Sequence, residues 1–125
     1  MKFLIFIALG GASGAVARYL LGTWVHRLWE GHFPMGTLLV NVVGSFAIGV
    51  VYVLIVEREL IHHDWRGMLM VGFLGAFTTF ATFSLETITL LESGQIWHAL
   101  GYVLASVVLC LAMAGVAIQL TRALI

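Results

Sequence analysis

The sequence predicts an all-α integral membrane protein with four membrane-spanning helices and almost no soluble part. Hydrophobic residues make up 62% of the chain and charged residues only 10%, and the mean hydropathy of +1.08 is far above that of soluble domains. The 125 residues contain four apolar segments, each of roughly the 20 residues needed to cross the hydrocarbon core of a bilayer. We therefore predict a single transmembrane domain, residues 1–125.

The first span is predicted at about residues 2–23. Lys2, the apolar run that follows it and the small residues Ala15 and Ala17 imitate a secretory signal peptide with a cleavage site. However, the apolar pattern continues to Trp24, which is long enough to span a membrane. We therefore expect an uncleaved spanning helix.

The other three spans are predicted, in chain order, at about residues 36–56, 66–92 and 96–119. A polar loop with the only proline, Pro34, separates the first two spans, and it also contains Glu30 and His32. Two further short polar connections, residues 57–64 and 92–95, separate the remaining spans. Because the connections are short, consecutive helices should be antiparallel neighbours.

Residues typical of span ends and of helix contacts support this layout. All four tryptophans fall near predicted ends of spans, where indole rings favour the headgroup region: Trp24, Trp29, Trp65 and Trp97. Gly10 and Gly14 form a GxxxG pair, which lets two helices approach closely within a membrane. Adjacent His62 and His63 lack the spacing of metal ligands on a helix.

Charge gives weak guidance about orientation and excludes one class of partner. The formal net charge is zero, so long-range attraction to nucleic acid is not expected. With four spans, both termini and the second loop lie on one side, and basic residues on that side slightly outnumber those opposite: Lys2, Arg58, Arg66 and Arg122 against Arg18 and Arg27. The excess favours cytoplasmic termini only weakly, so insertion in both orientations is compatible with the sequence.

The third predicted span contains the least typical stretch, GFLGAFTTFATFSLE at residues 72–86. Hydroxyl groups cannot face hydrocarbon unpaired, so this stretch indicates an interior lined by water or ions. Gly72, Gly75 and the Thr78–Thr79 pair weaken the helix, and a break there would free backbone carbonyls, which are suitable ligands for Na⁺. A two-fold pair of chains would double these oxygens and enclose a passage that four helices can scarcely surround.

The second half of this stretch has the composition of an anion path. Phe80 and Phe83 share one helical face, and Thr78, Thr82 and Glu86 share an adjoining one. Phenylalanine rings presented edge-on stabilise an anion without a counter-charge that would trap it, and hydroxyls donate hydrogen bonds that replace water. Ordinary packing of the phenylalanines is the alternative.

Other polar residues lie within the spans. Arg18 is either an interfacial anchor or a permanent charge that attracts anions to a vestibule. Asn41 and Ser45 share a face of the second span, and Tyr102 and Ser106 share a face of the fourth. Hydrogen bonds between helices and contact with a polar ligand are both compatible with these pairs.

At these residues the chain resembles the fluoride channel family known as Fluc, or CrcB-type proteins. The stretch at residues 72–86 is close to the family pattern GFxGGxTTFSTFSxE, and agreement extends to a GGxxGxxxRYLL-like stretch ending at Arg18–Leu21 and to a GTLxxN pattern at residues 36–41. Two positions depart from the pattern: Ala76 replaces a glycine and Ala81 replaces a serine, so one hydroxyl is missing.

The resemblance implies a dual-topology antiparallel homodimer in the inner (plasma) membrane, with two fluoride pores and a structural Na⁺ at the dimer interface. The backbone carbonyls of Gly75 and Thr78 would bind the Na⁺. Together with Arg18 and Glu86, the ion pathway would comprise Asn41, Phe80, Phe83, Thr79, Thr82, Tyr102 and Ser106. The implied function is passive fluoride export that lowers fluoride toxicity in the cytoplasm, with no enzymatic step and no protein substrate.

Two other classes of membrane protein were weighed against a fluoride channel. A small multidrug exporter of similar length would require an acidic coupling residue deep in the first span, and that span has none. A structural subunit of a larger membrane assembly would account for the small residues at helix contacts. It would not account for the threonines and phenylalanines of the third span.

Overall fold

The computed structural model describes residues 2–29, 31 and 33–125, and within this part of the chain the regular structure is entirely helical. Two segments, η1 and η2, are π-helical, and the rest are α-helices. In chain order the elements are α1 (Lys2–Leu28), α2 (Met35–Tyr52), η1 (Val53–Glu57), η2 (Gly67–Leu74), α3 (Gly75–Phe77), α4 (Ala81–Glu92) and α5 (Ile96–Leu124). The predicted all-α class is confirmed for the described residues.

Four helical stretches are long and apolar enough to cross a membrane: Lys2–Leu28, Met35–Glu57, Gly67–Glu92 and Ile96–Leu124. The first and last run past the predicted ends at residues 23 and 119. An α-helix satisfies its own backbone hydrogen bonds, so it can continue beyond the hydrocarbon core into the polar headgroup region. Glu30 and His32, which we predicted in the first loop, lie outside the described residues.

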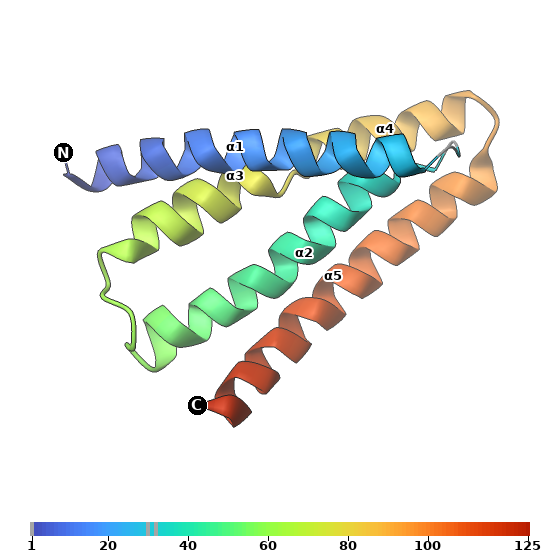
Figure 1. Cartoon of the computed structure of the whole chain (residues 1–125). Helices are drawn as coiled ribbons and strands as arrows, with labels where there is room; N and C mark the ends of the chain where they lie inside the picture. Colours follow the sequence, from blue (N-terminus) through green and yellow to red (C-terminus); the bar gives the residue numbers. More distant parts are fainter. Residues whose placement is uncertain (1, 30, 32) are drawn as a thin grey trace.

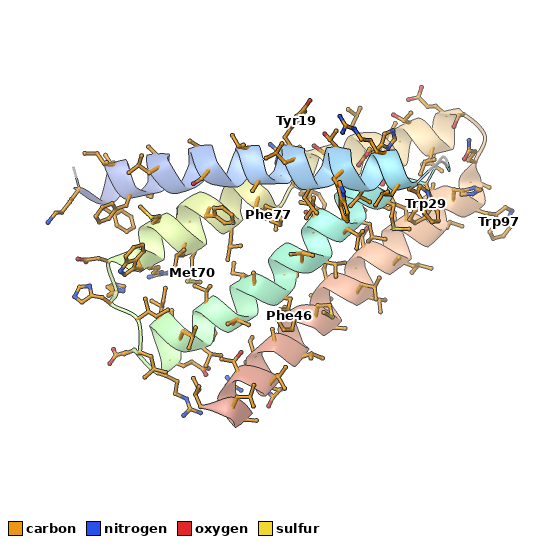
Figure 2. The ribbon with its side chains drawn as sticks, in the orientation of Figure 1. Tyr19, Trp29, Phe46, Met70, Phe77 and Trp97 are labelled. Atoms are coloured by element: carbon orange, nitrogen blue, oxygen red, sulfur yellow. The ribbon has the colours of Figure 1, made fainter. Side chains whose placement is uncertain are left out.

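The helices form two closely packed pairs (Figure 1). One pair is α1 with η2 and α3, and the other is α2 with α5. Both chain termini and the connection at residues 58–66 lie toward one end of the molecule, and the other two connections lie toward the opposite end. Trp29 and Trp97 are found at that opposite end (Figure 2), as expected for residues at a membrane surface.

Backbone-to-backbone contact joins α1 to η2. A Cβ atom added at Gly14 would overlap the carbonyl oxygen of Phe73, and one at Gly72 would lie 2.6 Å from the carbonyl oxygen of Ile7. A Cβ at Gly10 would meet the Phe73 nitrogen at 2.9 Å. The close helix contact expected from the GxxxG pair is therefore confirmed, and η2 is the helix that contacts α1 there.

The second pair is held by apolar packing and by an ionic contact at one end. Val40, Val53 and Tyr102 are almost fully buried in the described part of the chain. Near the C-terminus, Arg122 forms a two-pronged ion pair with Glu57. This pair links α5 to the end of η1.

The third candidate span changes conformation between α3 and α4. Gly75 has helical torsions (φ −62°, ψ −37°), whereas Thr78 is extended (φ −83°, ψ 155°). Three residues, Thr78, Thr79 and Phe80, separate the two helices. The sequence predicted a helix weakened by Gly72, Gly75 and the Thr78–Thr79 pair, but the chain stays helical through Phe77, where α3 packs on α1, and leaves the helix only at Thr78.

We expect Gly14→Ala to destabilise the protein by about 1–3 kcal/mol, because the new methyl group would overlap the backbone of Phe73 and backbone atoms cannot move aside. Gly11→Ala is the matched control, since nothing lies within 4 Å of a Cβ at that position. Thermal unfolding in detergent would measure both variants. Equal unfolding temperatures for the two would contradict the close contact.

Candidate functional site

The interruption between α3 and α4 releases backbone groups that a continuous helix would pair with each other. In a helix, the N–H groups of residues 79–83 would donate to the carbonyls of residues 75–79. Within a membrane such groups must find other partners, because unpaired backbone groups cost several kcal/mol in hydrocarbon. The hydrogen bonds around the interruption show which side chains supply those partners.

Asn41 of α2 binds both backbone groups of Thr79. The Thr79 N–H donates to Asn41 Oδ1 (2.8 Å), and Asn41 Nδ2 donates to the Thr79 carbonyl (3.0 Å). One N–H of the Asn41 amide is left over for another acceptor. Because the Thr79 N–H is directed to Asn41, the carbonyl of Gly75 loses the donor that a helix would give it.

Arg18 of α1 binds the next carbonyl. Its Nε–H donates to the carbonyl oxygen of Ala76 at 3.0 Å, and the side chain is half-buried. In a continuous helix this carbonyl would accept from Phe80. The arginine that the sequence placed near the end of a span is therefore attached to the third span.

The Thr79 side chain also binds the first turn of α4, whose N-cap residue, Phe80, makes no side-chain cap. The Thr82 N–H donates to Thr79 Oγ1 (3.3 Å), and the Thr79 hydroxyl donates to Thr82 Oγ1 (3.2 Å). A side-chain oxygen that accepts from an N–H three residues later is typical of a helix N-cap. The redirected Thr82 N–H leaves the Thr78 carbonyl, like that of Gly75, without its helical donor.

Most hydroxyls of the third span donate to backbone carbonyls of their own helix. Thr78 donates to Leu74 (3.0 Å) and Ser84 to Phe80 (3.0 Å). These groups have therefore used their single donor hydrogen. Ser106 on α5 differs: its Oγ is buried and has no hydrogen-bond partner among the described residues.

Aromatic rings continue from the interruption toward α5. The ring centroids of Phe80 and Phe83 are 5.4 Å apart, and those of Phe83 and Tyr102 are 5.0 Å apart. Phe80 is 78% exposed, whereas Tyr102 is fully buried. The Tyr102 hydroxyl donates to Glu86 Oε1 at 3.1 Å, which joins α5 to α4.

A cavity of about 390 Å³ lies where α2, α5 and the interruption meet. Much of its wall is apolar, but several predicted pathway and metal residues contribute to it: Asn41, Thr78, Thr79, Phe80, Phe83 and Ser106. Asn41 and Ser106 thus border the same cavity as the two phenylalanines. Such a wall offers a few hydrogen-bond donors in apolar surroundings.

Two further cavities lie on the α1 side of the interruption. The smaller, about 180 Å³, is bordered by Arg18, Thr79 and Thr82, and the larger, about 480 Å³, is bordered by Glu86 and His26. Thr37 borders both cavities. Most of the site residues predicted from the sequence therefore border one of three neighbouring cavities. Two of them do not: Tyr102 is buried and packs on Phe83, and Gly75 lies within α3.

Sequence reasoning missed two cavity residues on α2. Thr37 lies one turn before Asn41, and Ser45 lies one turn after it. Ser45 was noticed as a partner of Asn41 but was not placed in the pathway, and it borders the 390 Å³ cavity. The four-residue spacing of Thr37, Asn41 and Ser45 was the signal that could have identified all three as one polar stripe.

Comparison with known proteins identifies relatives over nearly the whole chain. The family model described as "CrcB-like protein, Camphor Resistance (CrcB)" matches residues 5–118. A protein of Hahella chejuensis named fluoride-specific ion channel FluC is 50% identical over 119 residues, covering 95% of this chain and 94% of that protein. A protein of the same name from Geobacter metallireducens is 48% identical over 122 residues, covering 98% of each chain.

We expect Asn41→Leu to raise amide hydrogen exchange in the segment around Thr79 by about tenfold or more, because the substitution removes both hydrogen bonds that hold that residue. Hydrogen–deuterium exchange of peptides covering residues 75–85 would measure the change. Ser45→Ala, one turn away on the same helix face, serves as the control. Unchanged exchange in Asn41→Leu would show that the amide does not fix the interruption.

Proposed function

The chain belongs to the CrcB-like family of membrane proteins, and from that premise we propose that it is a fluoride-selective channel through which fluoride leaves the cell passively. The protein is a transport protein and not an enzyme. One observation carries the proposal: Phe80, Phe83, Asn41 and Ser106 border the same cavity, and the buried Ser106 hydroxyl has no hydrogen-bond partner among the described residues. Relatives named fluoride-specific ion channel FluC share about half of this chain's residues.

The cavity has the donors that a small anion needs when it loses water. Asn41 keeps one amide N–H beyond the one bound to Thr79, and the Ser106 hydroxyl is uncommitted within the described residues. The positive edges of Phe80 and Phe83 add weak attraction without a full counter-charge. Several weak sites in series allow an anion to enter and also to leave.

The two cavities on the α1 side would form the entrance to this pathway. Arg18, Thr79 and Thr82 border the smaller one and Glu86 borders the larger one. Tyr102 would restrict the position of the Glu86 carboxyl group through its hydrogen bond.

We further propose that the channel is an antiparallel homodimer of chains with opposite topology. Phe80 is 78% exposed on this chain, and Leu111 on α5, which borders the same cavity, is 70% exposed. A partner chain would cover these side chains and close the open side of the cavity. The weak charge bias of the loops is compatible with insertion in both orientations.

The carbonyls of Gly75 and Thr78 would hold a structural Na⁺ at the axis of this dimer. Both carbonyls have lost the donor that a continuous helix would give them, because Asn41 and Thr79 bind the N–H groups concerned. Two carbonyls from each chain would supply four hard oxygen ligands, a donor set suited to an alkali cation. The bound ion would neutralise the carbonyl dipoles that converge there.

In this arrangement the interruption lies at mid-membrane depth, in the plasma (inner) membrane. Thr78–Phe80 fall close to the middle of the third candidate span, Gly67–Glu92. Ala81, where the family pattern has a serine, begins α4 and contributes no hydroxyl to the pathway. Thr82 and Ser106 would then be the main hydroxyl donors.

Purified protein in liposomes should release fluoride rapidly without a proton gradient and should retain chloride, as a passive fluoride-selective channel would. A fluoride electrode and a chloride electrode would follow the two ions.

Phe80→Ile should lower fluoride efflux by about tenfold or more, since it removes the ring edge nearest the interruption. Phe3→Ile, an exposed residue near the N-terminus, serves as the control.

Equal release of fluoride and chloride would refute fluoride selectivity. Efflux that requires a proton gradient would favour a coupled exporter instead of a channel. If Phe80→Ile conducts fluoride as fast as the wild type while remaining folded, Phe80 is not part of the pathway.

Replacing Na⁺ by N-methylglucamine throughout purification should weaken the dimer and reduce fluoride efflux, because the four carbonyls would then face one another without a cation. Size-exclusion chromatography with light scattering would report the dimer, independently of transport. Restoring Na⁺ should restore both readouts. A dimer and an efflux rate that do not change would argue against Na⁺ at Gly75 and Thr78.

A further inference from the structure

We propose that Arg18 is a positioning residue: its Nε–H donates to the carbonyl of Ala76 and thereby fixes the backbone conformation at the interruption of the third span. This inference rests on the proposed channel function and assigns a specific task to one of its residues. This role differs from the one predicted from the sequence, in which the positive charge of Arg18 attracts anions.

The hydrogen bond is placed where the backbone most needs a partner. Ala76 is the residue whose helical donor, the Phe80 N–H, is separated from it by the extended Thr78. The Arg18 Nε–Ala76 oxygen distance of 3.0 Å is that of a good hydrogen bond, and the donor is charged. Charge-assisted hydrogen bonds are roughly twice as strong as neutral ones.

A second contact makes this geometry rigid. Gly14, one turn before Arg18, lies against the backbone of Phe73, so the start of the Arg18 side chain is fixed relative to the third span. Gly10, one further turn back, contacts Met68 and Phe73. Three successive turns of α1 therefore contact successive parts of the third span, and Arg18 is the last of them.

Arg18 and Asn41 hold the interruption from two different helices. Asn41 binds Thr79 from α2, and Arg18 binds Ala76 from α1. Between these two attachments lie Phe77 and Thr78. Releasing either attachment would let the backbone between Ala76 and Thr79 change its direction.

The same hydrogen bond reduces the electrostatic effect of Arg18 on a passing anion. The negative end of the Ala76 carbonyl dipole lies against the guanidinium group and offsets part of its positive field. A charged group at membrane depth is also most stable when backbone carbonyls solvate it. Both considerations favour a structural use of the Nε–H over long-range attraction.

Two substitutions separate the hydrogen bond from the charge. Arg18→Gln removes the charge but places an amide nitrogen at the same number of bonds from Cα as Nε, so it can still donate to Ala76. Arg18→Met introduces a side chain about as long as that of glutamine, but it removes both the charge and the hydrogen-bond donor. Arg27→Met, at an exposed position near the end of the same helix, is the control for loss of a positive charge.

We expect Arg18→Gln to lower fluoride efflux by less than about threefold and Arg18→Met to lower it by at least about tenfold, with Arg27→Met unchanged. Amide exchange in peptides covering residues 75–82 should rise in Arg18→Met and stay near the wild-type value in Arg18→Gln. Equal losses of efflux in the two Arg18 variants, with exchange unchanged, would overturn the inference in favour of charge. Full efflux in both would also overturn it.

Salt dependence provides a test that does not require Arg18→Met to fold. Attraction by a charge is screened as ionic strength rises, with a Debye length of about 10 Å at 0.1 M. Positioning predicts that the ratio of Arg18→Gln to wild-type efflux stays constant between low and high salt, and a ratio that rises toward one would overturn it. If the wild type carries no fluoride, the proposed function fails, whereas the exchange experiment still tests the attachment of Arg18 to Ala76.

Discussion

The structure depends on one constraint, which is that backbone groups released inside a membrane must find partners within the protein. The third span leaves its helix at Thr78, and five N–H groups (residues 79–83) and five carbonyls (residues 75–79) lose their regular pairing. The neighbouring helices are arranged around this requirement. Asn41 comes from α2, Arg18 comes from α1, and Thr79 and Thr82 pair with each other at the start of α4.

These partners also decide which groups remain for an ion. A hydroxyl that donates to a carbonyl of its own helix, as Ser84 does, has no donor hydrogen left for an anion. Asn41 uses only part of its amide, and the Ser106 hydroxyl has no partner in the described part of the chain. The donors available to an ion in the cavity are therefore the side-chain groups that are not bound to the backbone. Their number matters more than the number of polar residues in the third span.

Sequence reasoning succeeded where periodicity and composition carry the information. The number of spans, the polar character of residues 72–86 and the close contact at Gly10 and Gly14 all follow from local patterns. The bonds of Arg18 to Ala76 and of Asn41 to Thr79 join residues 58 and 38 positions apart. No local pattern reports such a pairing, so both side chains were assigned to the ion without their attachment to the backbone.

The contacts of α1 with the third span also set a register. Gly10, Gly14 and Arg18 recur every four residues, so they lie along one side of the helix and meet η2 and α3 in succession. One residue inserted between Gly14 and Arg18 would rotate the arginine by about 100° around the helix axis and turn it away from Ala76. Inserting a whole turn would keep the helix face but move the arginine about 5.4 Å along the axis, so the spacing between Gly14 and Arg18 is fixed by their contacts with the third span.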